Sequence, residues 1–373
     1  MDTRNWFSPL PKKSQRRFLK SQRKQLWIEI DQKTLLNFSS NDYLGLSQHP
    51  ELCQAAISSI NAEGLGSGAS RLVSGDHPVF HAFEQQLAHW KGYEDALLVG
   101  SGMLANIGLL QALANRHTSL FCDKLNHASL VDGARLSQAK VYRYAHNDLV
   151  QLERLLQQHD AERRIIVSDG VFSMDGDAAD TDALMVLAEE YQCLLIVDDA
   201  HGLGVMGSQG KGLLAEKSGH DYLIEVGTLG KSFGSYGAFI LGSQAMIEGL
   251  RQRQRTMIYS TALPACLIQA ASVALERMQQ GERVEKLQHN IHFFVKHAQH
   301  LELLPSKSAI QALVLGSEER ALSASDQLAK EGFFVPAIRP PTVPINRSRL
   351  RITISALHEE KDILRLIQAL SHL

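Results

Sequence analysis

The 373-residue sequence has few cysteines and no excess of charge of either sign. Neither a C-x-x-C pair nor an H-E-x-x-H motif is present, and the 4 cysteines are far apart: Cys53, Cys122, Cys193 and Cys266. We therefore expect reduced thiols and no metal site, because disulfide frameworks and short-spaced zinc sites need closer spacings. With 38 Lys+Arg against 40 Asp+Glu, the net charge of -2 argues against nucleic-acid binding and favours small-molecule ligands.

Long hydrophobic runs are also missing. No stretch reaches the roughly 18 uncharged apolar residues that a membrane span needs, and the basic first residues lack the apolar core of a signal peptide. We therefore expect a cytoplasmic protein. Hydrophobic residues make up 44% of the chain, and its length corresponds to about two domains. Such a chain can bury a sizeable core and hold a cofactor between layers.

Short apolar runs alternate with longer helical periods over most of the sequence. This pattern predicts an α/β fold with a mostly parallel central sheet and helices on both faces. Helical patterns at 148–158 and 182–191 separate some of the runs. The strand candidates are 96–99, 119–122, 141–144, 164–167, 194–197, 222–226 and 238–241.

The pattern changes after Pro264, which opens a long amphipathic stretch that ends near Gly281. Beyond it we expect a smaller α+β domain with helices at 284–301 and 323–331 and a final helix, and strands at 309–315, 334–338 and 350–354. The predicted divisions are an N-terminal segment (1–45), a large domain (46–270) and a small C-terminal domain (271–373). A basic cluster in the N-terminal segment is compatible with a solvated helix face, or with attraction of an acidic carrier protein: Arg16, Arg17, Lys20, Arg23 and Lys24.

The first motif with chemical potential is Gly100-Ser101-Gly102-Met103, which follows an apolar strand and opens a helix. Free amide groups at a helix N-terminus and the helix dipole favour an anion, and glycine permits close approach by a phosphate. The same letters fit a dinucleotide-binding G-x-G-x-x-A pattern, with Asp123 about twenty residues later. The motif alone leaves both interpretations open.

A second motif, Asp198-Asp199-Ala200-His201, ends the strand at 194–197. An acid in this place lies at the carboxyl edge of the sheet, where open α/β folds bind ligands. Two acids there are compatible with Mg²⁺. One acid is equally compatible with pairing to a pyridinium nitrogen, which would keep an aromatic ring protonated as an electron sink.

The third motif surrounds Lys231 with glycines and hydroxyl groups, in the stretch GTLGKSFG that begins at Gly227. A partly desolvated lysine at a strand end loses its proton more easily than a free lysine and can form a Schiff base. The spacing of the glycines does not fit a P-loop.

Together, a phosphate turn, a strand-end acid with a histidine, and a hydroxyl-flanked lysine are the contacts that pyridoxal phosphate requires. The set resembles fold-type I pyridoxal-phosphate enzymes, and Asn126-His127-Ala128-Ser129 is similar to a motif of the α-oxoamine synthases. The resemblance covers nearly the whole chain. It includes NFSSNDYLGLS from Asn37, GSGASRLVSGDHPVFHAFE from Gly66, GVFSMDGD from Gly170, DDAHGLG from Asp198 and IRPPTVP from Ile338.

The resemblance implies a role for each matching residue. Lys231 would join covalently to pyridoxal phosphate and later move the substrate proton, Asp198 would pair with the pyridinium nitrogen, and His201 would bond to the ring's phenolic oxygen. His127 would stack on the ring and polarise a thioester. The remaining cofactor contacts would come from the backbone of Gly102 and Met103, from Ser173 and Thr228, and from Thr261 of the other subunit of a homodimer.

The substrate-side stretches resemble those synthases that condense L-alanine with a pimeloyl thioester carried on coenzyme A or on acyl carrier protein. By this resemblance Arg339 would bind the amino-acid carboxylate with help from Asn41. Thr342 and either Arg16 or Arg17 would contact the acyl donor. Two alternatives stay open: a sister synthase that condenses glycine with another acyl-CoA, and a nicotinamide-dependent dehydrogenase built on the Gly100 turn.

Overall fold

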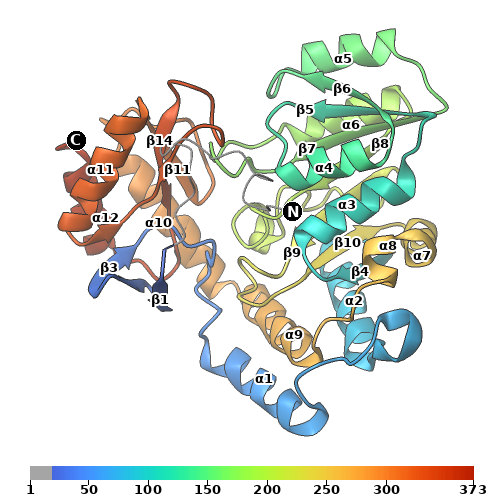
Figure 1. Cartoon of the computed structure of the whole chain (residues 1–373), viewed down its shortest axis with the longest axis horizontal. Helices are drawn as coiled ribbons and strands as arrows, with labels where there is room; N and C mark the ends of the chain where they lie inside the picture. The colour runs from blue at the N-terminus through green and yellow to red at the C-terminus, as the bar shows by residue number, and fades with distance from the viewer. Residues whose placement is uncertain (1–18) are drawn as a thin grey trace, which may run out of the picture.

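The computed structural model describes residues 19–373, which form two bodies joined by long helices (Figure 1). The larger body holds the central sheet, and the smaller one contains the C-terminal helices and strands. Helices α1 (Pro50–Glu63) and α9 (Ala265–Gln279) pack against each other along the side that connects the two bodies. No helix within residues 19–373 is long and apolar enough to cross a membrane.

The central sheet has seven strands in the order β4-β10-β9-β8-β7-β5-β6. Its strands are β4 (Asp95–Val99), β5 (Thr118–Asp123), β6 (Lys140–Tyr144), β7 (Arg163–Asp169), β8 (Leu194–Asp198), β9 (Leu223–Thr228) and β10 (Ala238–Gly242). All seven strands expected from the sequence are confirmed. Only β10 runs antiparallel to its neighbours, so the carboxyl ends of the other six strands of this sheet share one edge.

Helices cover both faces of this sheet, as predicted. One face packs against α3 (Gly102–Leu113), α4 (Ala128–Leu136) and α7 (Gln244–Arg253). The other packs against α2 (Pro78–Lys91), α5 (Leu149–Gln158), α6 (Thr181–Glu190) and α9. Alternate strand residues feed the two cores: Ile196 lies in one and Val197 in the other, and both are fully buried.

Side chains cap several of these helices where the sequence suggests a start. The Asp148 carboxylate accepts a hydrogen bond from the amide of Gln151 at the start of α5, and Asp180 does the same at α6. Helix α2 begins with Pro78 and ends at Gly92 in the left-handed conformation. These local signals explain why the predicted helix bounds at 148–158 and 182–191 differ from the observed ones by only one residue at either end.

The smaller body has a three-stranded sheet of order β11-β14-β13, with β11 (Ile310–Gly316), β13 (Ala337–Ile338) and β14 (Ser348–Thr353). Its helices are α10 (Glu282–His297), α11 (Glu318–Lys330) and α12 (Glu360–Leu370). The short helix α8 (Arg255–Ile258) precedes α9 in the larger body. The predicted α+β character of the C-terminal part is confirmed, although α11 begins five residues earlier than expected.

The N-terminal segment differs from the helix face considered above. Strands β1 (Ser21–Lys24), β2 (Trp27–Ile30), β3 (Lys33–Asn37) and β12 (Phe333–Phe334) form a four-stranded sheet in that order. Arg23 and Lys24 therefore lie on a strand, whereas Arg16 and Arg17 fall outside the described residues. Because β3 pairs with β12, the segment belongs with the smaller body. The predicted junction at 270/271 falls inside α9.

Candidate active site

Strand ends bring the predicted acid Asp198 and a second acid, Asp169, to one edge of the central sheet. β8 ends at Asp198 and β7 ends at Asp169, and the two residues pair across adjacent parallel strands. The loop after β9 carries Lys231 to the same edge. This is the place where open α/β sheets bind ligands.

Asp198 is buried, and its carboxylate is held from two sides. The side-chain amide of Asn106, on α3, donates to Oδ2 over 2.6 Å, and the amide of Ala200 donates to Oδ1 over 3.0 Å. Asn106 also donates to Ser129 Oγ over 2.9 Å. Hydrogen bonds to a carboxylate stabilise its charged form. The Asp198 carboxylate is therefore held in one orientation at the bottom of the site.

Asp199 faces away from its neighbour. Its Oδ2 accepts a hydrogen bond from the amide of Leu213 over 2.7 Å. A Cβ atom on Gly202 or Gly212 would lie 2.0 Å from the Asp199 carboxylate oxygens, so these glycines let two loops close around it. Burial first, and then the nearby Glu225 charge, raise the pKa of Asp199 to about 8. The two adjacent acids thus hold different partners, which disfavours the magnesium interpretation.

Lys231 is partly buried beside these carboxyl groups. Burial lowers the pKa of its amine to about 8, while the charges of Asp198 and Asp169 oppose that shift and the Arg351 guanidinium adds to it. With a pKa of about 8, about a tenth of the amine is neutral at pH 7, far more than for a lysine with the ordinary pKa of about 10.4. A neutral amine is the nucleophile that Schiff-base chemistry requires.

His201 lies under the same group of charges and is almost fully buried. Burial, reinforced by the positive charges of Lys231 and Arg351, holds the pKa of His201 well below its usual value. Its Nδ1 lies 2.6 Å from the hydroxyl of Tyr43, and burial raises the pKa of that phenol to about 12. The protonated phenol can donate either to Nδ1 or to Asn41 Oδ1, which lies 3.4 Å away. In the tautomer that accepts at Nδ1, the neutral ring carries its own proton on Nε2.

His127 forms the N-cap of α4 and keeps an exposed face. Its Nδ1 lies 2.7 Å from Ser129 Oγ, and its backbone amide donates to Asp169 Oδ2 over 2.6 Å. Burial of part of the ring and the charge of Lys231 lower the pKa of His127, whereas the Asp198 carboxylate raises it. Asn126 fixes the loop by donating to the carbonyl of Val167 over 2.8 Å. The Asn-His-Ala-Ser motif thus orients one imidazole beside the lysine and Asp198.

The glycine turn lies at the start of α3, as predicted. Ser101 is the N-cap, and its hydroxyl accepts from the amide of Leu104 over 3.3 Å. Apart from its chain neighbours and the backbone of its own helix, no described atom lies within 4 Å of a Cβ built on Gly102, so the turn is open on that side. Met103 is exposed, and Thr228, at the end of β9, donates to the carbonyl of Gly237 over 3.1 Å. The first amides of a helix lack intrahelical partners and can bind an anion.

Arg351, on β14 of the smaller body, reaches the site although the sequence analysis did not single it out. The guanidinium donates through Nη2 to Asn41 Oδ1 over 3.2 Å and through Nε to the carbonyl of Ser173 over 2.5 Å. Its positive charge acts on both Lys231 and His201. The structure therefore gathers the predicted residues Asn41 and Ser173 around an arginine that was missed.

Of the other predicted contact residues, the structure describes three and leaves one outside its described range. Arg339 forms an ion pair with Glu318 at 3.8 Å, and Thr342 is exposed three residues later. Thr261 is exposed and lines a small cavity that includes Gly100. Arg16 lies outside the described residues. The functional roles of Arg339, Thr342, Thr261 and Arg16 stay predictions.

Sequence reasoning also missed Asn106, Asp169 and Tyr43. Asn106 lies within α3, one helical turn after the glycine turn, and an amide at such a position is the one available signal. Asp169 ends a predicted strand, as Asp198 does, so the same rule identifies it. Burial and the Asp198 charge hold the pKa of Asp169 well above its usual value. Tyr43 has no comparable signal, because its partner is 158 residues away.

The residues at this edge fit pyridoxal phosphate. An open helix N-terminus suits a phosphate, a fixed buried anion suits a pyridinium nitrogen, and a partly neutral lysine suits an aldehyde. The Nε2 proton of His201 suits a phenolate oxygen. Asn106 Oδ1 is buried and has no hydrogen-bond partner within residues 19–373. This oxygen is therefore available to accept a hydrogen bond from a bound ligand.

Comparisons with known proteins agree with this geometry. A family model described as aminotransferase class I and II matches residues 33–370, so the chain belongs to that family. The 8-amino-7-oxononanoate synthases of Saccharophagus degradans and Hydrogenovibrio crunogenus are both 46% identical to it. The matches span 350 and 351 residues, 92% of this chain and 88% of each relative. Within the larger family, the chain therefore belongs to the 8-amino-7-oxononanoate synthases, acyltransferases of biotin biosynthesis.

Solved structures show the same fold. A serine palmitoyltransferase from S. paucimobilis with a bound PLP–myriocin adduct has a TM-score of 0.90 at 25% identity, covering 95% of this chain and 91% of that one. An 8-amino-7-oxononanoate synthase from Francisella tularensis has a TM-score of 0.78 at 32% identity, covering 91% of this chain and 97% of that one. The fold-type I assignment is confirmed. Membership in the aminotransferase family replaces the dehydrogenase alternative.

Proposed function

We propose that the chain binds pyridoxal phosphate through Lys231 and condenses L-alanine with a pimeloyl thioester, releasing CO₂ and a thiol. The product would be 8-amino-7-oxononanoate. The observation that carries the proposal is the juxtaposition of a lysine of lowered pKa with the fixed carboxylate of Asp198 at one sheet edge. When bound, the cofactor supplies an electron sink for the negative charge left at the substrate Cα.

The chain's own residues hold the cofactor and move protons around it. The α3 amides of Gly102 and Met103, with Thr228, would hold the phosphate, and Asp198 would keep the ring nitrogen protonated. His201 would donate from Nε2 to the phenolic oxygen. A neutral Lys231 amine that is not bonded to the cofactor would accept the proton from the substrate Cα and return it later.

Arg351 is our candidate for the substrate's α-carboxylate. Its guanidinium already lies beside Asn41 and close enough to Lys231 to lower the pKa of the amine. A planar fork of donors suits a carboxylate bidentately. We therefore assign to Arg351 the role that the resemblance suggested for Arg339, which forms an ion pair with Glu318.

His127 would act on the acyl donor. The His127 side chain is exposed, and its Nδ1 is held by the hydroxyl of Ser129. An oriented ring of this kind can stack on a planar cofactor and donate a proton to a thioester carbonyl during attack. Thr342 stays a candidate contact for the donor. The acyl donor would be the thioester of coenzyme A or of acyl carrier protein.

A second copy of the chain is the proposed partner of an exposed apolar surface near the glycine turn. Leu65, Leu72, Val73 and Tyr259 are 69–78% exposed. Contiguous exposed apolar side chains favour burial against a partner. A homodimer that covers them would bring Thr261 toward the second copy, in the role the resemblance suggests.

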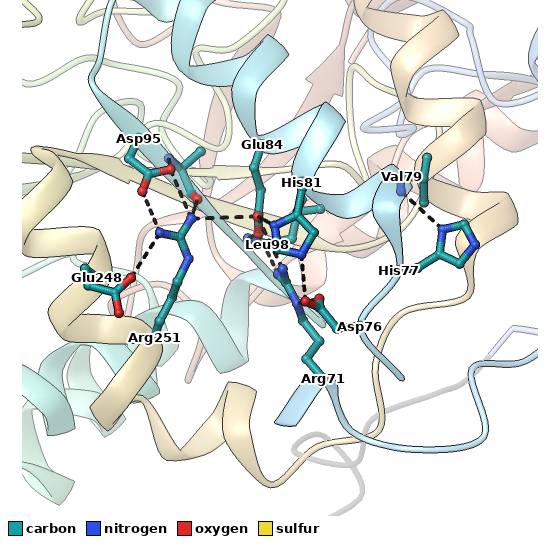
Figure 2. A network of polar contacts seen from close by, with 11 residues as sticks. Arg71, Asp76, His77, Val79, His81, Glu84, Asp95, Leu98, Glu248 and Arg251 are labelled. Carbon is teal, nitrogen blue, oxygen red and sulfur yellow. Dashed lines mark hydrogen bonds and ion pairs between the residues drawn. The ribbon is translucent and has the colours of Figure 1, made fainter. Parts of the chain in front are cut away.

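An ion network holds the turn that carries Leu72 and Val73. Figure 2 shows Arg71 between Asp76 and Glu84, whose carboxylate also accepts from the amide of Leu98 over 2.8 Å. Glu84 is only 2% exposed, so the turn is anchored to α2 and β4 rather than free in solvent. A rigid turn presents its apolar side chains at low entropic cost.

Lys231→Ala tests the central proposal. The variant should bind pyridoxal phosphate without covalent attachment and lose turnover, whereas borohydride treatment of the wild type should leave a pyridoxyl group on the Lys231 peptide. Normal turnover by the variant, or an unlabelled peptide in the cofactor-supplemented wild type, would contradict the proposal. Crossing alanine and glycine with thioesters of different chain length then separates this function from a sister synthase, because serine palmitoyltransferase shares the fold.

A further inference from the structure

A short loop, Ser173–Asp177, lies between the two bodies and contacts both. We call it the bridging loop. Its turn is closed by backbone hydrogen bonds: the Phe172 amide donates to the Asp177 carbonyl over 2.9 Å, and the Gly176 amide donates to the Phe172 carbonyl over 2.8 Å. The loop is thus a compact unit that can transmit the position of one body to the other.

On the side of the smaller body, two arginines of β14 form hydrogen bonds and an ion pair with the bridging loop. Arg351 donates to the carbonyl of Ser173 over 2.5 Å, and Arg349 donates to the carbonyl of Met174 over 3.4 Å. Arg349 also pairs with the Asp175 carboxylate. The loop therefore helps to orient Arg351, our candidate for the substrate carboxylate.

The bridging loop also contacts the segment that leads into β11. The hydroxyls of Ser306 and Ser308 both donate to the carbonyl of Gly176 over 2.8 Å. Gly176 has a φ of 83°, and a Cβ atom there would lie 2.2 Å from the carbonyl oxygen of Ile310. Only glycine allows this approach, so the loop fits tightly against the smaller body.

On the side of the larger body, His146 joins the loop to the central sheet. Its Nε2 lies 2.7 Å from Asp177 Oδ2, and its Nδ1 lies 3.2 Å from Oδ1 of Asp123 at the end of β5. Asn147 donates to the same Asp177 oxygen over 3.0 Å. The imidazole also packs edge-on against Phe172, with ring centroids 4.3 Å apart. An imidazole that bridges two carboxylates is a cationic tie between sheet and loop.

We propose that His146 is a positioning residue: through Asp177 it fixes the bridging loop, and the loop fixes Arg351 relative to Lys231. This inference rests on the proposed function, in which Arg351 binds the amino-acid carboxylate. Arg351 belongs to the smaller body and Lys231 to the larger, so their separation depends on how the bodies are held. A misplacement of about 1 Å can cost on the order of a hundredfold in an oriented site.

The test uses the cofactor-loaded protein and the variants His146→Gln and Asp177→Asn, with His117→Gln as the matched control. His117 is exposed and contacts its neighbour Arg116, on the same body but away from the loop. We expect each loop variant to raise the dissociation constant of L-alanine about tenfold. The visible absorbance of the cofactor reports this constant. The double variant should resemble either single one, because both remove the same tie.

The split between kinetic constants separates positioning from general damage. The KM for alanine should rise, while kcat and the KM for the thioester should stay within about threefold of wild type. Amide hydrogen exchange in residues 172–178 should quicken in both variants even without cofactor or substrate. Asp177→Asn preserves side-chain size, so it provides the test if His146→Gln does not fold.

Three results would overturn the inference. Unchanged exchange in the loop would show that His146 does not fix it. An unchanged dissociation constant for alanine would show that the loop does not position Arg351. Equal losses for alanine and thioester would show only general loosening. A wild-type protein that does not bind L-alanine would instead reject the proposed function, and the exchange result would still decide whether the tie exists.

Discussion

Asn106 and Asp198 are 92 residues apart in sequence and are joined by a 2.6 Å hydrogen bond. The amide of Asn106 donates to the carboxylate that would face the pyridinium nitrogen, and it also holds Ser129, the partner of His127. One buried amide therefore connects the anion at the floor of the site to the imidazole at its open face. Its position one turn after Gly102 links both to the phosphate-binding turn.

Asn106→Ala should weaken cofactor binding. A hydrogen bond to a charged group contributes about 1.5–3 kcal/mol, which corresponds to a loss of about 10- to 150-fold in affinity if Asp198 loses its orientation. Titration of cofactor-free protein with pyridoxal phosphate, followed by absorbance, measures this affinity. Asn115→Ala is the control, because Asn115 lies exposed just after the same helix. Equal affinities for Asn106→Ala and wild type would show that Asp198 needs no such support.

Arg351→Lys and Arg339→Lys should differ in their effect on L-alanine. Lysine keeps the charge but loses the bidentate fork, so Arg351→Lys should raise the KM for alanine by about 10- to 100-fold. Arg339→Lys should leave it within about twofold, because Arg339 pairs with Glu318. Steady-state kinetics with each substrate varied in turn gives both values. The reverse pattern would show that Arg339 binds the carboxylate of L-alanine, as the resemblance alone suggested.

Lys231 should titrate with a midpoint near 8 in cofactor-free protein. Below that pH the amine is protonated and unreactive, and above it the neutral amine reacts with acetic anhydride. Competitive labelling across pH 6–11, read by mass spectrometry of the Lys231 peptide, gives the midpoint, and the exposed Lys33 reports on reagent behaviour. Asp198→Asn should move the midpoint lower, because the Asp198 charge raises the pKa of the amine. A Lys231 midpoint above 10 would contradict the burial argument.

The sequence predicts those parts of the site that are encoded locally. Asp198 and Lys231 each follow an apolar run, so strand ends identify them. Arg351 and His146 are different, because their significance depends on partners brought from other elements, 310 residues away for Asn41 and 31 for Asp177. No local pattern records such a partnership.

The predicted fold differs from the structure where the sequence carries no local signal. Strand β1 reads Ser-Gln-Arg-Lys, a polar edge strand without an apolar face, and its only pairing in the described residues is with β2. Its basic residues therefore resemble a helix face as much as a strand. The reversed direction of β10 is equally hidden, since an apolar strand buried on both faces reads the same in either orientation.

The proton on His146 should make the stability of the folded protein depend on pH. Burial lowers the pKa of its imidazole, but the hydrogen bonds and charges of Asp123 and Asp177 outweigh it and raise the pKa to about 10. The folded protein thus keeps a proton that the unfolded chain releases near its ordinary value of about 6.5. The stabilisation is therefore complete below about pH 6.5 and declines as pH rises through 10.

Urea unfolding of wild type and His146→Gln at several pH values measures this change. The difference in unfolding free energy should be largest at pH 6 and should shrink steadily to a small value by pH 10, since only the wild type loses a proton from this site. His117→Gln should show no such trend, because its ring is exposed and is not placed between two carboxylates. A constant difference between wild type and His146→Gln would mean that the imidazole has the same pKa in the folded and unfolded protein, so that the two acids do not raise it.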